Sequence, residues 1–128
     1  MNKKTKKSFK DFVTRPKSNA GVTLPIPEFD GETITILGGD SDVFRIEQDK
    51  ILSDLRDDNL GDKKPTAEEI YQKEEENRIR QVAVLVVGWS FDEECTRENV
   101  EEFLTDAPHV RKFVDLEAGR MSHFLGKK

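Results

Sequence analysis

The sequence contains a single cysteine, Cys95, among its 128 residues. One thiol excludes a disulfide within the chain and a metal site built only from thiolates. Long apolar runs are also missing, since the longest, residues 82–87, is far shorter than the roughly 18 apolar residues that span a bilayer. The N-terminus is basic with no apolar run behind it, so we expect no secretory signal. These absences favour a cytoplasmic protein with no membrane partner.

Motifs that carry catalytic chemistry are absent as well. The chain has no phosphate-binding loop, dinucleotide fingerprint, nucleophile elbow or zinc-finger spacing, and its acidic run 92–94 lacks the spaced ligands of a calcium loop. His109 and His123 would lie about 21 Å apart along one helix, too far to share a metal ion or a proton. Cys95 precedes a predicted helix, which would stabilise a thiolate, but no histidine is near it in sequence to act as a base. We therefore predict no enzyme activity, no metal site and no cofactor.

The charges are unevenly distributed along the chain. Charged residues make up 37% of the sequence and the net charge is −5. Residues 1–17 carry seven cations and one anion, a sum of +6, which leaves −11 for residues 18–128. An acidic body of this kind repels a polyanion such as DNA, so we do not expect nucleic acid as a partner. A small regulator that binds nucleic acid through its basic segment remains an alternative.

Residues 1–20 are expected to form a basic, flexible N-terminal arm, because a lysine-rich terminus is typically solvated. Phe9, Phe12 and Val13 fit a second interpretation, in which the arm contains a short helix that anchors on a partner or on the core. The lysines available to an acidic partner surface are Lys3, Lys4, Lys6, Lys7 and Lys10.

Residues 21–38 have the pattern of a β-hairpin. Apolar residues alternate with other residues over 22–26 and again over 33–36, as expected for paired strands. The dipeptide Asp30-Gly31 between them is typical of a tight turn. Because two prolines near the end of the first segment cannot donate ladder hydrogen bonds, that strand should be short and lie at a sheet edge.

Helical periodicity follows the hairpin. We predict helices over about 41–57, 66–88, 97–105 and 108–125. Each has a start signal, either a side chain that accepts amide hydrogen bonds or a proline in the first turn. These signals are Asp40 or Ser41 for the first helix, Thr66 with Glu69, Thr96, and Pro108.

The apolar segment 82–87 is compatible with two structures. As the end of the helix over 66–88 it would be apolar on all sides and therefore buried. Its β-branched residues instead favour a buried strand. Both alternatives place the segment in the core of a mainly α, single α+β domain over residues 21–128, with a short N-terminal β-hairpin.

The chain resembles the tail assembly chaperones of long-tailed bacteriophages. In the N-terminal half the similar features are the basic start, the short sheet around Asp30-Gly31 and a helix that begins near Asp42-Val43-Phe44-Arg45. From Val82 to Leu125 they are the apolar segment that runs into Gly88-Trp89-Ser90-Phe91, the loop to Cys95-Thr96, the helix Glu98 to Leu104, the Ala107-Pro108 break, and a final helix with Arg120 ahead of Phe124.

The resemblance implies a non-catalytic protein made in the cytoplasm of the infected host. Such chaperones escort the tape measure protein, a long helical chain that sets tail length, until tail tube subunits polymerise around it, and they are absent or largely absent from the finished virion. Many are also produced in a longer form by a ribosomal frameshift, for which the codons of residues 126–128 are a candidate site. Self-association is a further expected contact.

We expect the C-terminal helical pair to carry the partner-binding surface, with the basic arm as a second contact. For Trp89 and Phe91 the alternative is that they close the end of the core. A structural tail component, such as a connector or terminator retained in the virion, is the alternative function. The candidate binding residues are Trp89, Phe91, Phe103, Phe113, Met121 and Phe124.

Overall fold

The computed structural model describes residues 8–59 and 64–125. Helices dominate these residues, and a small antiparallel sheet accompanies them, so the predicted mainly α, α+β class is confirmed. In chain order the elements are η1 (Phe9–Asp11), α1 (Arg15–Ala20), β1 (Val22–Pro25), β2 (Thr33–Ile36), α2 (Asp42–Asn59), α3 (Ala67–Ala83), β3 (Val86–Trp89), α4 (Arg97–Asp106), α5 (Pro108–Ala118) and α6 (Met121–Phe124).

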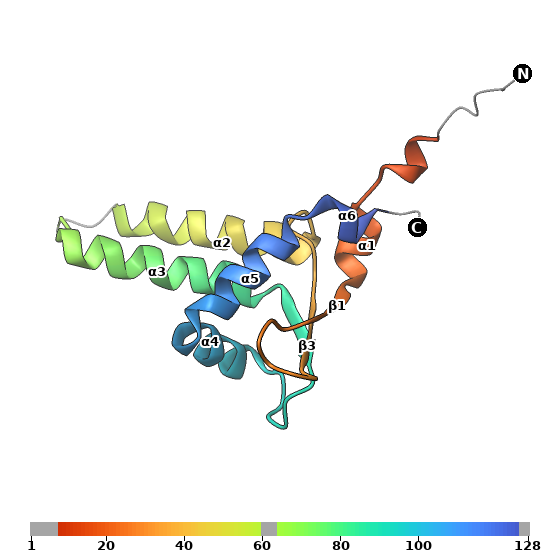
Figure 1. Ribbon diagram of the computed structural model, residues 1–128. Helices are drawn as coiled ribbons and strands as arrows, with labels where there is room; N and C mark the ends of the chain where they lie inside the picture. The colour runs from red at the N-terminus through yellow and green to blue at the C-terminus, as the bar shows by residue number, and fades with distance from the viewer. Residues whose placement is uncertain (1–7, 60–63, 126–128) are drawn as a thin grey trace, which may run out of the picture.

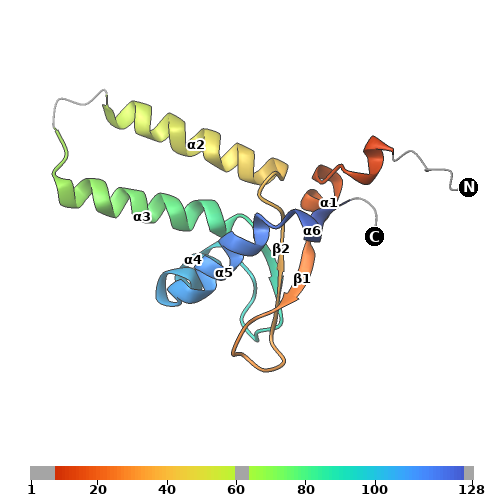
Figure 2. The same ribbon diagram turned by 45° about the horizontal axis from the view of Figure 1, so that its top comes forward.

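Helices α2 and α3 form a long hairpin that extends away from the sheet (Figure 1). Helices α4 and α5 lie along α3, while α1 and α6 lie side by side at the opposite end of the molecule from the hairpin tip (Figure 2). No helix in the described ranges is long and apolar enough to cross a membrane.

The predicted hairpin is present, and its two strands belong to a sheet of order β1-β2-β3. Strand β1 pairs antiparallel with β2, opposing Val22 to Ile36 and Leu24 to Ile34, and it lies at an edge, as predicted. These apolar residues share one face of the sheet. On the other face the hydroxyl groups of Thr23 and Thr35 are 2.8 Å apart. The sheet is therefore apolar on the face that meets the core and polar on the other.

The prediction of a helix over residues 66–88 is wrong beyond Ala83. Residues 86–89 form β3, which pairs antiparallel with the free side of β2. This outcome matches the strand alternative that the β-branched residues allowed. The physical reason is long-range: β2 would otherwise present an unpaired edge inside the fold, and the segment satisfies it. The amide of Leu37 donates to the carbonyl of Leu85 at 2.8 Å, just before the strand begins.

An irregularity in this pairing determines where Trp89 lies. Ile36 opposes Val86 and Thr35 opposes Gly88, so Val87 is an extra residue in β3. Val87 is 50% exposed. The extra residue shifts the alternation of β3 by one position, and Trp89 consequently opposes Ile34 on the apolar face.

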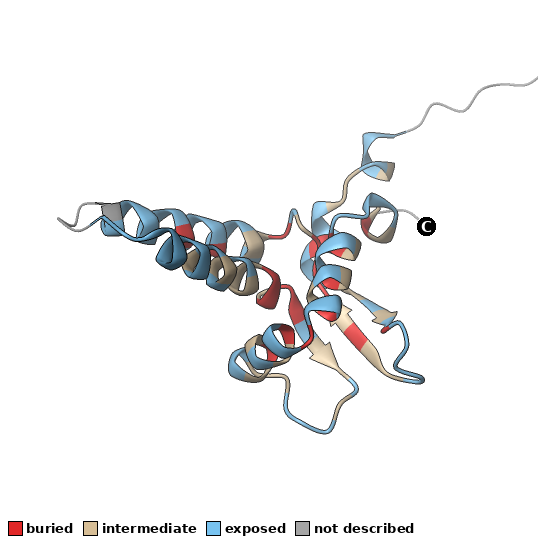
Figure 3. Ribbon diagram, turned by 60° about the vertical axis from the view of Figure 1, so that its left-hand side comes forward, coloured by how far each residue is buried: buried red, intermediate tan, exposed pale blue. Residues whose placement is uncertain are grey.

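The core forms where the sheet, the end of α3, α4 and α5 meet (Figure 3). Four residues of the segment 82–87 are buried there, as predicted, namely Val82, Ala83, Leu85 and Val86. The prediction is wrong for Val87, which is exposed. Helices α4 and α5 contribute side chains with relative exposures of 1% or less, namely Val100, Leu104, Val110 and Val114. The outer surfaces of the α2–α3 hairpin are mostly exposed (Figure 3).

The prediction of one continuous helix over 108–125 is also wrong. Helix α5 ends at Ala118, and the short helix α6 begins at Met121. The carbonyl of Ala118 accepts a hydrogen bond from the amide of Gly39 at 2.9 Å. Gly119 caps the end of α5, and after the turn α6 packs against α1.

Part of the predicted flexible arm is ordered. Residues 15–20 form α1, in which Ser18 is completely buried and its carbonyl accepts the amide of Gly38 at 3.0 Å. Phe9 and Phe12 are 75% and 61% exposed, so they do not anchor on the core of the chain. Lys10 is exposed, whereas Lys3, Lys4, Lys6 and Lys7 lie outside the described residues, as do the candidate frameshift residues 126–128.

The helix start signals gave mixed results. The capping box of Thr66 and Glu69 is confirmed, with both reciprocal hydrogen bonds formed. Thr96 caps α4 and Pro108 occupies the first turn of α5, as predicted. The prediction that Asp40 or Ser41 caps α2 is wrong. The first amide of α2, from Asp42, donates to Asn19 Oδ1 on α1 at 2.8 Å. The carboxylate of Asp40 instead accepts hydrogen bonds from Thr14 and Ser18, and the buried Ser41 hydroxyl has no hydrogen-bond partner among the described residues.

Candidate partner-binding site

Three of the six candidate residues form an aromatic cluster. The ring centroids of Trp89 and Phe91 are 5.3 Å apart, those of Trp89 and Phe103 are 5.7 Å apart, and those of Phe91 and Phe103 are 5.2 Å apart. All three contacts are edge-to-face, the arrangement that aromatic rings favour. The rings pack against the core yet stay partly exposed, so they both close the end of the core and present apolar surface.

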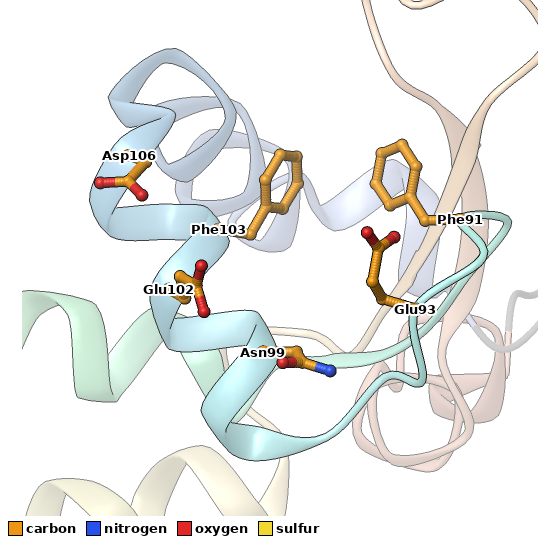
Figure 4. Close-up of a pocket in the computed structure, with 6 residues that line it drawn as sticks. All are labelled: Phe91, Glu93, Asn99, Glu102, Phe103 and Asp106. Atoms are coloured by element: carbon orange, nitrogen blue, oxygen red, sulfur yellow. The ribbon is translucent and has the colours of Figure 1, made fainter.

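The loop between β3 and α4 holds this cluster in place. The indole Nε1 of Trp89 donates to the backbone carbonyl of Glu93 at 2.7 Å. Asn99 Nδ2 on α4 donates to the carbonyl of Glu94 at 2.8 Å. An open pocket of about 300 Å³ lies between this loop and α4. Figure 4 shows its lining residues, which are Phe91 and Glu93 from the loop and Asn99, Glu102, Phe103 and Asp106 from α4.

The other three candidate residues lie elsewhere. Phe113 is partly buried against the core, and Phe124 is 2% exposed. Met121 is 67% exposed. Met121 and Phe124 line a separate pocket of about 210 Å³ beside the loop that precedes α2. Among the six candidates, ring contacts therefore join Trp89, Phe91 and Phe103. Met121 and Phe124 lie on α6, which packs against α1.

The α2–α3 hairpin presents apolar side chains that the sequence analysis assigned to no site. Leu52 is 53% exposed, Ile70 47% and Tyr71 62%. A pocket of about 480 Å³ near the tip has Leu55 and Ile70 in its lining. The apolar stripes of the two helices could have predicted these exposed side chains, because the contact between two helices cannot cover every apolar residue of both.

A buried carboxylate joins three helices on the α2–α3–α4 side of the molecule. Glu47 Oε2 accepts from Arg80 Nε at 2.9 Å and from Arg97 Nη2 at 3.2 Å. Burial raises the pKa of Glu47, but the hydrogen bond from Arg80 and the charge of Arg97 together lower it further, so the net pKa lies below the ordinary value. This ionic cluster is fully paired and acts as a structural tie.

Reactive groups are not assembled into a site. Burial raises the pKa of the Cys95 thiol, the opposite of what a nucleophilic cysteine needs. His123 Nε2 is 2.7 Å from Glu117 Oε1, in a partly buried contact. Among residues 8–59 and 64–125 no group of three or more histidine, cysteine, aspartate or glutamate side chains has the arrangement of a metal site.

Comparison with known families gives the decisive observation. A family model described as phage tail assembly chaperone matches residues 6–115, most of the chain. The chain belongs to the phage tail assembly chaperone family. No curated protein and no solved structure matches it significantly.

Membership of this family agrees with the resemblance seen in the sequence. The tail assembly chaperones are a non-enzymatic family, so the prediction that this protein is not an enzyme is confirmed. Membership also implies that the chaperone binds tail proteins. The match includes the whole aromatic cluster and ends within α5, so α6 with Met121 and Phe124 lies outside it.

Proposed function

We propose that this chaperone binds the tape measure protein in the cytoplasm of the infected host, keeps it soluble, and helps to recruit tail tube subunits during tail assembly. The observation that carries the proposal is the family match over residues 6–115. The partners follow from the resemblance of the chain to chaperones that escort a tape measure protein.

The physical need for such a protein is clear. A long chain with exposed apolar helical stripes aggregates unless those stripes are covered. A small partner of 128 residues, with a charge of −11 over residues 18–128, covers apolar surface and adds repulsion between complexes. Covering must be reversible, because tail tube subunits have to replace the chaperone. Partly exposed apolar side chains on a rigid scaffold suit reversible binding better than a large apolar interface.

We assign the main contact to the face that carries Trp89, Phe91 and Phe103. Aromatic side chains dominate binding energy in protein interfaces, and these three already have their geometry fixed by mutual contacts. The basic arm supplies a second, electrostatic contact through Lys3, Lys4, Lys6, Lys7 and Lys10. Exposed Phe9 and Phe12 beside it add apolar surface for the same partner.

Co-expression with the tape measure protein of the same phage tests the proposal. The chaperone should raise the amount of soluble tape measure protein and co-purify with it. Phe91→Ala should reduce both effects, whereas Leu116→Ala, which removes a 62% exposed side chain from α5 outside the pocket, should leave them unchanged. Substitution is a sharper test than truncation, because α4 and α5 supply fully buried core residues.

Two results would contradict the proposal. One is a tape measure protein that remains insoluble with the folded wild-type chaperone present. The other is stoichiometric retention of this protein in purified virions, which would indicate a connector or terminator. Circular dichroism of both variants checks that they fold.

A further inference from the structure

The pocket beside the aromatic cluster has an acidic rim. Glu93 on the loop and Glu102 and Asp106 on α4 all line it, and all three residues are exposed. Among the described residues none of these carboxylates has an ion-pair partner, whereas Glu47, Glu75, Glu101 and Glu117 each have one. The nearest arginine on α4, Arg97, is already paired with Glu47 and Glu101. The described part of the chain therefore leaves the negative charge of the rim uncompensated.

The apolar part of the pocket consists of aromatic rings. Phe91 from the loop and Phe103 from α4 lie side by side in edge-to-face contact, next to the carboxylates of Glu93 and Glu102 (Figure 4). The negative face of an aromatic ring attracts a cation within about 6 Å of its centre. Rings and carboxylates consequently favour the same kind of ligand, a cation that also has an apolar or planar portion.

We propose that this pocket binds the guanidinium group of an arginine side chain that the tape measure protein presents. The inference rests on the proposed function and adds the chemistry of the contact. Arginine fits better than lysine, because its planar group stacks on a ring while its N–H groups reach two carboxylates. Its aliphatic stem packs on phenylalanine. The volume of about 300 Å³ accommodates one such side chain.

The pocket is preorganised for this ligand. The hydrogen bond from Trp89 Nε1 holds the backbone of Glu93, and the hydrogen bond from Asn99 holds the backbone of Glu94 against α4. The two walls therefore keep their separation without a ligand, and binding costs little ordering of the chain. Trp89 is the only tryptophan in the sequence, and its indole contacts Phe91, Phe103 and the Glu93 carbonyl, so its N–H signal is a probe beside this pocket.

A titration of the full chain tests the pocket without the tape measure protein. The probes are Nα-acetyl-arginine amide and the uncharged analogue Nα-acetyl-citrulline amide, and the readout is the NMR signal of the Trp89 indole N–H. The arginine compound should shift the signal in a saturable way, and the citrulline compound should not. No shift with arginine, or an equal shift with both compounds, would overturn the proposal.

Charge-neutralising variants locate the site. The triple variant Glu93→Gln, Glu102→Gln, Asp106→Asn should abolish the saturable shift. The control Asp49→Asn, Asp57→Asn, Asp115→Asn removes the same number of exposed charges away from the pocket and should retain it. Equal loss in both variants would show that net charge, rather than this pocket, attracts the arginine.

Affinity for the tape measure protein then connects the pocket to the function. The pocket triple variant should bind it about tenfold more weakly than the control triple variant, as is typical for losing a close charge pair at an interface. Equal affinities would overturn the proposed role of the pocket while leaving the chaperone function intact. If the wild-type protein does not bind the tape measure protein at all, the proposed function fails, and the arginine titration still decides whether the pocket binds a guanidinium group.

Discussion

Glu47 on α2 accepts a hydrogen bond from Arg80 on α3 at 2.9 Å, and the Glu47 side chain is only 7% exposed. The same oxygen contacts Arg97 on α4 at 3.2 Å, and Arg80 also reaches Asp54 at 3.0 Å. One buried carboxylate thus ties the hairpin to α4, which carries four of the six residues that line the aromatic pocket. Removing one partner of such a pair leaves the others desolvated without compensation.

We predict that Glu47→Gln lowers the free energy of unfolding at pH 7 by about 1–3 kcal/mol, because a buried charge-assisted hydrogen bond is lost. Since the folded-state pKa of Glu47 is below its ordinary value of 4.5, its contribution is fully present above that pH and is lost as pH falls toward the folded pKa. The stability difference between the two proteins should therefore begin to shrink as the pH falls below about 4.5 and should vanish only below the folded-state pKa of Glu47. Urea unfolding at several pH values measures this.

The matched control is Glu101→Gln, whose carboxylate pairs with Arg97 at 2.6 Å but is 38% exposed. An exposed pair contributes about 0–1 kcal/mol, so this variant should stay close to wild type at every pH. A larger loss from Glu101→Gln than from Glu47→Gln would contradict the assignment of the buried tie.

Adjacent glycines should respond differently to alanine. A Cβ atom at Gly38 would lie 2.6 Å from the Cβ of buried Ser18, so Gly38→Ala should push α1 away from the loop and destabilise the fold. At Gly39 the nearest atom would be 3.4 Å away, and Gly39→Ala should be tolerated. Thermal unfolding compares the two, and equal melting temperatures would contradict this close approach.

The capping box at the start of α3 should contribute measurably to stability. Thr66→Ala removes the oxygen that accepts the Glu69 amide at 3.1 Å, and we expect a loss of about 1 kcal/mol. Hydrogen exchange should accelerate in the first turn of α3. Ser53→Ala, at an exposed position within α2, is the control, and we expect little change there. Unchanged protection in α3 would argue against the cap.

The basic arm should contribute to partner binding in a salt-dependent way. Lys4→Gln, Lys6→Gln, Lys7→Gln should weaken binding of the tape measure protein at low salt, and the difference should vanish near 1 M salt, where the screening length is about 3 Å. The control Lys50→Gln, Lys64→Gln, Lys112→Gln makes the same change in net charge on the body. Equal weakening by both variants would indicate a general charge effect.

Local signals in the sequence predicted much of the secondary structure. The alternating pattern around Asp30-Gly31 predicted the hairpin and its edge strand, and Thr66, Thr96 and Pro108 marked three helix starts. These predictions succeeded because a turn or a cap depends on residues within about four positions of one another. The prediction of the cap of α2 failed because the residue that caps it, Asn19, belongs to another helix.

The sequence did not show which candidate binding residues the fold brings together. Trp89, Phe91 and Phe103 form one cluster, whereas Met121 and Phe124 line a separate pocket; that these residues bind a partner stays a prediction. Helical spacing of the apolar residues alone did not reveal that α5 ends at Ala118, where Gly119 caps it and the amide of Gly39 donates to the Ala118 carbonyl. The sequence shows the acidic residues of the rim, but it could not predict that they line one pocket, because the loop and the helix meet only in the folded chain.

Residue order alone was sufficient to establish the charge separation, the apolar segments, the local turns and the resemblance to a chaperone family. Tertiary structure decided that residues 86–89 form a strand, that an extra residue turns Trp89 to the apolar face, and that α6 packs on α1. Each of these outcomes depends on backbone hydrogen bonds between segments distant in sequence. Such pairing stabilises the fold as a whole, and its free energy exceeds the local preference of a segment for helix or strand.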